Sequence, residues 1–450
     1  MDLLSGIGDA DQLISAREEN KVLRAKVDEL TMKVKELNLD NATLKAEVEI
    51  YRKEAGLPNF SKLALGKTPS SDDSMNSPSK GLGEEFISSG NGIYPTNPEV
   101  SLPNINGFSN PLCCALNRSD TLLASGGADS FVSVVAWGSA LAPNPNAATD
   151  AVSNAAKVRC PAPVICLDFC KDCDIISAGC MDGSVKLIGY SYVGGKIHAW
   201  PLNIVNGEGI KYTKYVKAVA WSESSSIIAS SSADGTAQLS KISLITDDEV
   251  MGGNHDFEDS FQQNIKIEKL KSFHFIGAVE ALCFVNKGRS LCLYERDTSY
   301  LTYFDLNDEY KMTKYSLNGS TTGGFDDFVS FAVMRLVLSP NGKYLCAATD
   351  ASRNIIIEVG TDKIIRDLFG HKNDSYSQPR VTWSSNGQYI FGNTQEDCSI
   401  CVWDIASSTI VQKLKEHTGQ IKDMFSSKTS DTLITASYDK TVKVWLNDNI

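Results

Sequence analysis

The stretch that decides the fold is residues 417–445, HTGQIKDMFSSKTSDTLITASYDKTVKVW. It contains three short apolar runs, IKDMF, TLITAS and TVKVW, which are separated first by a polar turn and then by a tight turn at Asp439. Apolar runs of this length between Ser-, Thr- and Asp-rich turns indicate β-strands. We therefore expect three antiparallel strands here.

The same pattern occurs seven times between residue 106 and the C-terminus. Each unit has an apolar strand, a short turn, a second strand, a tight turn at an Asp and a third strand. The turn aspartates are Asp129, Asp182, Asp234, Asp297, Asp350, Asp397 and Asp439, spaced 42 to 63 residues apart. Pairs such as Asn341-Gly342 supply the positive φ that tight hairpin turns need. This period predicts small sheets stacked radially or linearly, and excludes one sandwich.

These units resemble WD40 repeats, and seven of them resemble a seven-bladed β-propeller over residues 106–450. That family has a structural tetrad: a His before the first strand, a Ser on the second, the turn Asp and a Trp on the third. The last unit has all four, as His417, Ser437, Asp439 and Trp445. The resemblance implies that these residues pair buried polar groups and hold the turn, so that they are structural and not catalytic.

The other units keep only part of this set. The sixth has His371, Asp397 and Trp403, with Gln395 at the Ser place. The third has Ser232 and Asp234, with Ser240 where Trp is expected, and the fourth is the most degenerate. The first, second, fourth and fifth units contribute their turn aspartates.

Closure of the ring is predicted from the ends of the repeat region. The sequence ends five residues after Trp445, which leaves no room for an outer strand in the last unit. Residues 99–105, EVSLPNI, are expected to supply that strand, as is typical of WD40 proteins. Such an exchange removes the two free sheet edges.

Residues 9–55 show six heptads without Gly or Pro. Val at position a with Leu at position d favours a parallel two-stranded coiled coil, and Asn at a fixes its register. The central core positions are Asn20, Leu23, Val27, Leu30, Val34, Leu37, Asn41 and Leu44. The pattern predicts a long α-helix that forms a homodimer, with a heterodimer and a single helix packed on its own domain as alternatives. Acidic residues before the heptads argue against a leucine-zipper DNA binder.

Residues 56–105 are rich in Ser, Gly, Pro and Asn and lack apolar periodicity. This composition predicts a disordered, flexible linker. Thr68-Pro69 and Ser77-Pro78 resemble proline-directed kinase sites, so phosphorylation of this linker is a hypothesis.

Composition narrows the classes of protein. Lys and Arg number 43 against 55 Asp and Glu, a net charge of −12, which makes direct nucleic-acid binding unexpected. No apolar run approaches the roughly 20 residues that span a bilayer, and no secretory signal is evident. Twelve scattered Cys are expected to be reduced, in a cytoplasmic or nuclear protein.

Motifs for chemistry are missing from the sequence. It has no phosphate-binding Gly-rich loop, no His-Glu-x-x-His and no Gly-x-Ser-x-Gly, so we expect no enzyme activity, catalytic residue, cofactor or metal. Cys170-x-x-Cys173, near Cys166 and Cys180, invites a zinc hypothesis, but buried thiols explain it better. The acidic stretch 246–259 is expected to be a solvated loop, with docking of a basic peptide as the alternative.

The predicted function is that of a non-enzymatic scaffold or adaptor, which dimerises through its coiled coil and binds protein partners on its propeller. The alternative is a substrate-recognition or regulatory subunit of a ubiquitin ligase or phosphatase. Fold alone does not decide between them.

Overall fold

The computed structural model describes residues 89–138, 146–205, 208–223, 226–245, 263–318, 329–373 and 378–447, and the single residues 26, 32 and 86. The predicted coiled coil at 9–55, most of the predicted linker and the acidic stretch 246–259 lie outside the described residues. Two units divide the chain, residues 1–78 and 79–450, and the second holds the sheets.

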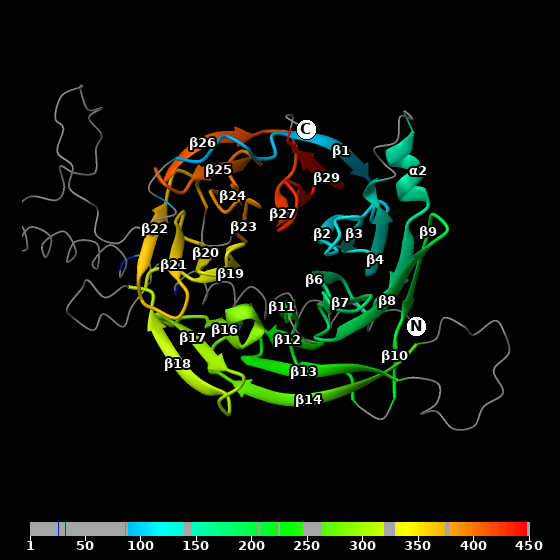
Figure 1. Ribbon diagram of the computed structural model, residues 1–450, viewed down its shortest axis with the longest axis horizontal. Helices are drawn as coiled ribbons and strands as arrows, with labels where there is room; N and C mark the ends of the chain where they lie inside the picture. The colour runs from blue at the N-terminus through cyan, green and yellow to red at the C-terminus, as the bar shows by residue number, and fades with distance from the viewer. Residues whose placement is uncertain are drawn as a thin grey trace, which may run out of the picture. The chain divides into compact units, whose positions relative to one another are not determined.

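The described part of the second unit is a ring of seven sheets (Figure 1). Each sheet is one blade, in which consecutive strands are antiparallel neighbours and the first strand lies nearest the axis of the ring. The predicted all-β, seven-bladed propeller is confirmed. The seven predicted turn aspartates all lie between the second and third strands of their blades.

The strands are listed here from the inner to the outer edge of each blade. Blade one has β2 (Pro111–Leu116), β3 (Leu122–Gly127), β4 (Phe131–Ala136) and β5 (Ala156–Arg159). Blade two has β6 (Val164–Phe169), β7 (Ile175–Cys180), β8 (Val185–Val193) and β9 (Lys196–Pro201). Blade three has β11 (Val216–Trp221), β12 (Ile227–Ser232), β13 (Thr236–Ile245), β14 (Asn264–His274) and β10 (Asn203–Ile204), the last parallel to β14. Blade four has β15 (Val279–Val285), β16 (Ser290–Glu295), β17 (Tyr300–Asp305) and β18 (Lys311–Ser316). Blade five has β19 (Val333–Leu338), β20 (Tyr344–Thr349), β21 (Asn354–Glu358) and β22 (Ile364–Leu368). Blade six has β23 (Val381–Trp383), β24 (Tyr389–Asn393), β25 (Ile400–Asp404) and β26 (Thr409–Leu414). Blade seven has β27 (Ile421–Ser426), β28 (Leu433–Ser437), β29 (Thr441–Leu446) and β1 (Asn97–Pro103).

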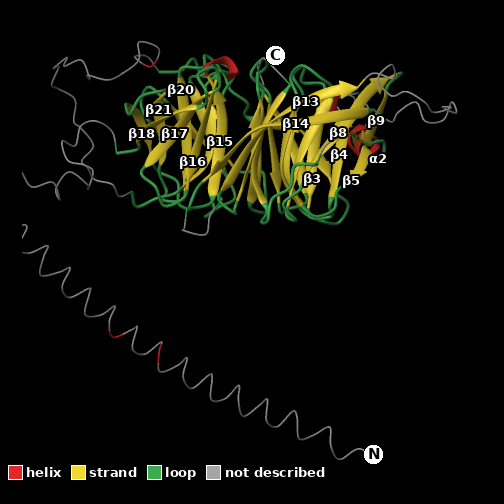
Figure 2. Cartoon of the chain, turned by 90° about the horizontal axis from the view of Figure 1, so that it is seen from below, coloured by secondary structure: helices red, strands yellow, loops and turns green. Residues whose placement is uncertain are grey.

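The strands run between two faces of the ring, and the turns cover both faces (Figure 2). One face carries the seven aspartate turns and the connections that lead into each inner strand. We name it the Asp-turn face. The other face carries the turns between first and second strands and between third and fourth strands.

The ring is closed by β1, as the sequence predicts. This strand pairs antiparallel with β29, from Asn97 opposite Leu446 to Pro103 opposite Thr441. Val100 and Leu102 of β1 are buried against the core of blades seven and one. Because β1 falls inside the segment predicted as linker, the folded propeller begins before the predicted boundary at residue 106.

A short segment before β1, residues 89–96, also lies against the ring, and we name it the strap. The backbone N–H of Gly90 donates to Asp404 Oδ1 at 2.8 Å, and that of Gly92 donates to the Tyr389 hydroxyl at 2.6 Å. The Tyr94 ring packs on Tyr389 with centroids 4.6 Å apart. These contacts fix the strap to blade six.

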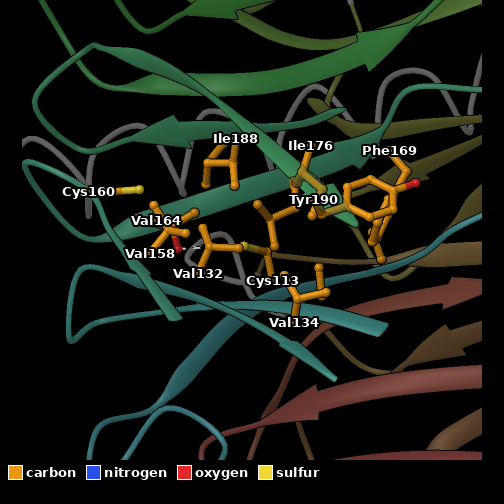
Figure 3. Close-up of a cluster of buried hydrophobic side chains, with 14 of the residues drawn as sticks. Cys113, Val132, Val134, Val158, Cys160, Val164, Phe169, Ile176, Ile188 and Tyr190 are labelled. Carbon is orange, nitrogen blue, oxygen red and sulfur yellow. Dashed lines mark hydrogen bonds between the residues drawn. The ribbon is translucent and has the colours of Figure 1, made fainter. Parts of the chain in front are cut away.

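The core lies between neighbouring blades because each blade buries both of its faces. Figure 3 shows the packing between blades one and two, where Cys113, Val132 and Val134 meet Val164 and Ile176. Cys166 and Cys180 lie inside β6 and β7, as predicted. Helix α2 (Ala147–Ser153) joins β4 to β5 and buries Ala147 and Ala151.

Candidate protein-interaction site at the Asp-turn face

Six inner strands have a β-bulge at the same place, one residue after the strand begins at the Asp-turn face. The pairing register shifts there in β2, β6, β11, β15, β19 and β27. A bulge leaves one residue out of the ladder and redirects its side chain. The residues at these bulges are Leu112, Ile165, Lys217, Glu280, Met334 and Lys422.

All six bulge residues line one cavity of about 420 Å³. It lies on the axis of the ring, at the Asp-turn end of the central channel that the inner strands surround. We name it the mouth cavity. Blade six has no such bulge among its described pairs, and contributes Gln378 and Arg380 instead. Every blade therefore presents a side chain to this cavity. The bulge residues Leu112, Ile165 and Met334 are apolar, and four other lining residues are charged, namely Lys217, Glu280, Arg380 and Lys422.

Two buried carboxylates pair with cationic side chains at or beside the mouth cavity. Glu280, with its side chain 2% exposed, pairs with Lys217 at 2.7 Å and with Arg296 at 3.1 Å. The hydrogen bond to Glu280 raises the pKa of Arg296. Each carboxylate of this kind needs a partner, since burial of an unpaired charge is costly.

Asp423 is the second buried carboxylate, 5% exposed, and it lies on β27. Its Oδ1 is 3.6 Å from Arg335 and 3.5 Å from Arg380. Its Oδ2 accepts a hydrogen bond from the backbone N–H of Cys114 on the next blade at 3.2 Å. Burial lowers the pKa of Arg380, and the charge of Asp423 partly offsets that effect. Asp423 therefore joins blades seven and one and pairs with two guanidinium groups, of which that of Arg380 lines the mouth cavity.

The rim of the mouth cavity exposes large apolar and aromatic side chains. Met181 is 52% exposed, Tyr215 39% and Tyr438 40%. The ammonium groups of two bulge residues lie over the tyrosine rings, Lys217 at 5.0 Å from Tyr215 and Lys422 at 4.6 Å from Tyr438. Aromatic, Met and cationic groups in such proximity are typical of binding surfaces.

The opposite end of the channel is crossed by ion pairs. Lys428 of blade seven pairs with Glu223 of blade three, which also lies 3.7 Å from Lys171 of blade two. Burial alone would raise the pKa of Glu223, but the two lysines lower it. Because blades three and seven are not neighbours, the Lys428–Glu223 pair spans the channel and narrows access from that side.

The tetrad of blade seven differs from the prediction in one member. His417 Nδ1 lies 2.7 Å from Asp439 Oδ2, and His417 Nε2 lies 2.7 Å from Thr435 Oγ1. Trp445 Nε1 donates to the same Thr435 hydroxyl at 2.8 Å. Thr435, and not Ser437, therefore connects His417 to Trp445. A neutral His417 with its proton on Nδ1 satisfies all these contacts.

Ser437 has another role, which Ser232 repeats in blade three. Ser437 Oγ donates to the Gly419 carbonyl at 2.8 Å, and Ser232 Oγ donates to the carbonyls of Lys214 and Tyr215. Both hydroxyls hold the connection that enters the inner strand. The residue that meets the His or Tyr of its blade lies two positions earlier, as Thr435 or Ser230, on the same side of the strand.

In blade three, other residue types take the positions of the tetrad and make other hydrogen bonds. The Tyr212 hydroxyl lies 2.7 Å from Ser230 Oγ, while Asp234 accepts from the Thr213 backbone and hydroxyl. Tyr212 and Ser230 stand as far before Asp234 as His417 and Thr435 stand before Asp439. The corresponding pair in blade one is Asn106 and Ser125, whose side chains bond at 2.7 Å.

Blade six keeps the His, Asp and Trp of the tetrad but not their contacts. Trp403 Nε1 donates to the Phe369 carbonyl at 2.8 Å, and Asp397 pairs with Lys415 at 2.9 Å. His371 packs edge-on against Trp403, and neither of its ring nitrogens has a hydrogen-bond partner in the described part of the chain. Burial, with a smaller effect of Lys413, lowers the pKa of His371 to about 4.

The remaining turn aspartates bind either their own turn or a connection beside it. Asp129 accepts from the Phe131 N–H, Asp182 pairs with Lys211 at 2.6 Å, and Asp350 accepts from the Ala332 N–H. Asp297 has a positive φ of 65° in the turn of blade four.

None of the residues predicted from the sequence lines the mouth cavity. The signal that was available is a polar residue directly after the first Val or Ile of an inner strand, as in VKAVAW, VEALCF and IKDMF.

Within the described residues, no three His, Cys, Asp or Glu side chains are grouped as for a metal ion. The same part of the chain has no helix of the length and hydropathy that a membrane span requires.

The ring defines the class: a seven-bladed β-propeller with an open, charged mouth on its Asp-turn face. Four segments match the family model of the WD domain, G-beta repeat: residues 156–188, 203–239, 362–404 and 408–445. Each segment ends on the third strand of a blade, in blades two, three, six and seven. WD40 repeats are thus present, and with the seven blades they support the WD40 family.

Curated relatives are WD-repeat proteins at low identity. The chain is similar to the WD-40 repeat-containing protein MSI3 of Arabidopsis thaliana, 26% identical over 106 residues, which is 23% of this chain and 25% of that protein. It is also similar to jouberin of Rattus norvegicus, 27% identical over 139 residues, 30% of this chain and 12% of jouberin. The chain thus matches a quarter or less of the length of each relative.

Proposed function

We propose that this protein is a non-enzymatic scaffold that binds a protein partner at the mouth of its propeller and dimerises through residues 9–55. The observation that carries the proposal is the mouth cavity, to which all seven blades contribute and whose rim exposes Met181, Tyr215 and Tyr438. Binding energy in protein interfaces concentrates in recessed, desolvated pockets near the centre, and tyrosine and arginine are enriched there. WD40 repeats and the propeller fold support protein binding in general.

The test is quantitative affinity purification of the full chain from cells, compared with a Tyr215→Ala/Tyr438→Ala double variant. Tyr192→Ala is the matched control, because Tyr192 is also an exposed tyrosine but lies on β8, away from the mouth. We expect a defined set of partners that the double variant loses and the control retains. If every partner is retained by the double variant, the mouth is not the binding site.

The same experiment addresses the alternative function. Recovery of a ubiquitin-ligase or phosphatase catalytic subunit by both the wild type and the double variant would favour a substrate-recognition or regulatory subunit over a scaffold. In that case the proteins that the double variant loses would be the substrates.

A further inference from the structure

The mouth cavity carries an excess of positive charge. Three cationic side chains, those of Lys217, Arg380 and Lys422, line it, against the single carboxylate of Glu280. Beside this lining, Arg296 also pairs with Glu280, and Arg335 pairs with the buried carboxylate of Asp423. This local excess contrasts with the net charge of −12 of the whole chain. A local patch of opposite sign in an acidic protein attracts ligands that the rest of the surface repels.

The accessible charge at the mouth is more positive than the count suggests. The carboxylates of Glu280 and Asp423 are 2% and 5% exposed, whereas the lining side chains of Lys217 and Arg380 are 15% and 14% exposed. Each carboxylate is shared by two cations, so each of these clusters keeps a net positive charge. Lys422 is partly exposed and has no carboxylate partner in the described part of the chain.

The shape of the site suits an inserted side chain. The mouth cavity is open on the Asp-turn face, and the Lys428–Glu223 pair spans the channel at the other end. The apolar rim of Met181, Tyr215 and Tyr438 can cover the backbone and apolar neighbours of an inserted acidic group.

We propose that the mouth cavity binds a partner segment with clustered Asp or Glu side chains, whose carboxylates pair with Lys217, Arg380 and Lys422. The proposal rests on the proposed function, because it names the ligand chemistry of the same site. Guanidinium groups bind planar carboxylates through paired hydrogen bonds. The two cation–π contacts hold the lysine ammonium groups at the rim, where they meet an entering segment.

The test is fluorescence anisotropy with the full chain and four labelled peptides of equal length. One peptide is rich in Asp and Glu around a central Tyr, the second has Asn and Gln instead, the third has phosphoserine, and the fourth has Lys. We expect the acidic peptide to bind at least about tenfold more tightly than the neutral one, and its Kd to rise about tenfold between about 50 and 300 mM NaCl.

Charge reversal locates the site. We expect Lys422→Glu to raise the Kd of the acidic peptide at least about tenfold, because the substitution removes a cation and adds a charge that repels the peptide. Lys440→Glu is the matched control, since Lys440 is an exposed lysine of the same blade and face outside the cavity, and it should leave the Kd unchanged within about twofold. Equal melting temperatures establish that both variants are folded. Lys217→Gln supplies a second test at the opposite side of the cavity.

Several outcomes overturn the proposal. No preference of the acidic peptide over the neutral one overturns it, as does tighter binding of the basic peptide or an equal effect of Lys422→Glu and Lys440→Glu. If the phosphoserine peptide binds about tenfold or more tightly than the acidic peptide, the ligand is a phosphorylated segment and not one rich in Asp and Glu. If Tyr215→Ala/Tyr438→Ala loses partners while Lys422→Glu keeps them, the face binds protein but the acidic ligand is wrong.

Discussion

In blade seven a single hydroxyl, that of Thr435, is shared by His417 and Trp445. The chain Trp445–Thr435–His417–Asp439 links the third strand, the second strand, the entry to the first strand and the tight turn. All four groups are buried or nearly so, and each has its partner within 2.8 Å. Such a network is stabilising only while every member is satisfied.

Thr435→Val should therefore destabilise the propeller. Valine keeps the shape of threonine but removes the hydroxyl, so that His417 Nε2 and Trp445 Nε1 both lose their partner. Leaving buried polar groups unpaired costs about 1–3 kcal/mol, which differential scanning calorimetry detects as a lower Tm. Thr313→Val, on the exposed strand β18, is the control and should leave the Tm unchanged. Equal Tm values for the two variants would contradict the assignment of Thr435.

His371 in blade six should make stability depend on pH. Its folded pKa is about 4, below the ordinary value of about 6.5, because the neutral ring is buried against Trp403. The unfolded chain therefore binds a proton that the folded chain does not, and stability falls as the pH drops from about 6.5 toward 4. From pH 7 to pH 5 this single group removes about 2 kcal/mol.

The test is the Tm between pH 7 and pH 5 for the wild type, His371→Phe and the exposed-site control His274→Gln. Phe keeps a flat ring beside Trp403 but does not titrate, so His371→Phe should lose less stability on acidification than the wild type. The control should follow the wild type. Parallel curves for all three chains would show that His371 is not the acid-sensitive group.

At the scale of single strands, two features decide the architecture: the bulges that aim side chains into the mouth cavity, and β1. The bulges repeat in six inner strands, at the residue after the first ladder pair. Without a bulge, the side chains of these residues would point into the core between two blades. With it, they point toward the axis of the ring and surround the mouth cavity. The mouth cavity is thus a property of strand pairing.

Removal of β1 should open the ring. A chain that begins at Phe108 loses the ladder between β1 and β29 and the burial of Val100 and Leu102. Each ladder hydrogen bond contributes about 0.5–1.5 kcal/mol, and several are lost together with apolar burial, so the total approaches the 5–15 kcal/mol of a typical domain. We expect aggregation or loss of a cooperative thermal transition.

Two longer chains separate the strand from the strap. A chain that begins at Ser79 keeps both and should melt cooperatively, whereas one that begins at Asn97 keeps β1 but loses the contacts of Gly90, Gly92 and Tyr94. It should fold with a lower Tm. If the chains from Asn97 and Phe108 were equally stable, closure by β1 would contribute nothing.

At the scale of the whole molecule, a dimer would present two mouth cavities to one partner. A bivalent target then gains from a high effective concentration, without any change in the single contact. We predict a parallel homodimer through residues 9–55. Leu30→Pro should abolish it, because proline in a helix interior costs about 3 kcal/mol or more and breaks the heptads on both sides.

Light scattering of the full chain measures this directly. The wild type should have twice the mass of the 48.9 kDa chain, and Leu30→Pro should have the mass of one chain. Ser74→Pro, in the predicted linker, is the control and should remain dimeric. A monomeric wild type would refute the homodimer, and dimer formation only with a second protein would establish the heterodimer.

The sequence by itself determined the number of blades and the closure of the ring. Seven aspartate turns are separated by strands whose apolar patterns are local, so their count and order can be read from the chain. Residues 99–105 were predicted to pair with the last unit because unpaired sheet edges are unfavourable, and β1 does pair with β29. These conclusions need only local propensity and the rule that strands pair.

The tertiary structure alone decided which side chains act together. Thr435 and Ser437 face the same side of β28 and look equally suitable in the sequence; only the folded position of His417 along that strand decides that it meets Thr435. Lys217, Glu280 and Lys422 converge because bulges displace them from the alternation that a strand pattern assumes. Lys217 of blade three meets Glu280 of blade four, and Asp423 of blade seven meets Arg335 and Arg380 from other blades; such contacts exist only once the blades have packed together.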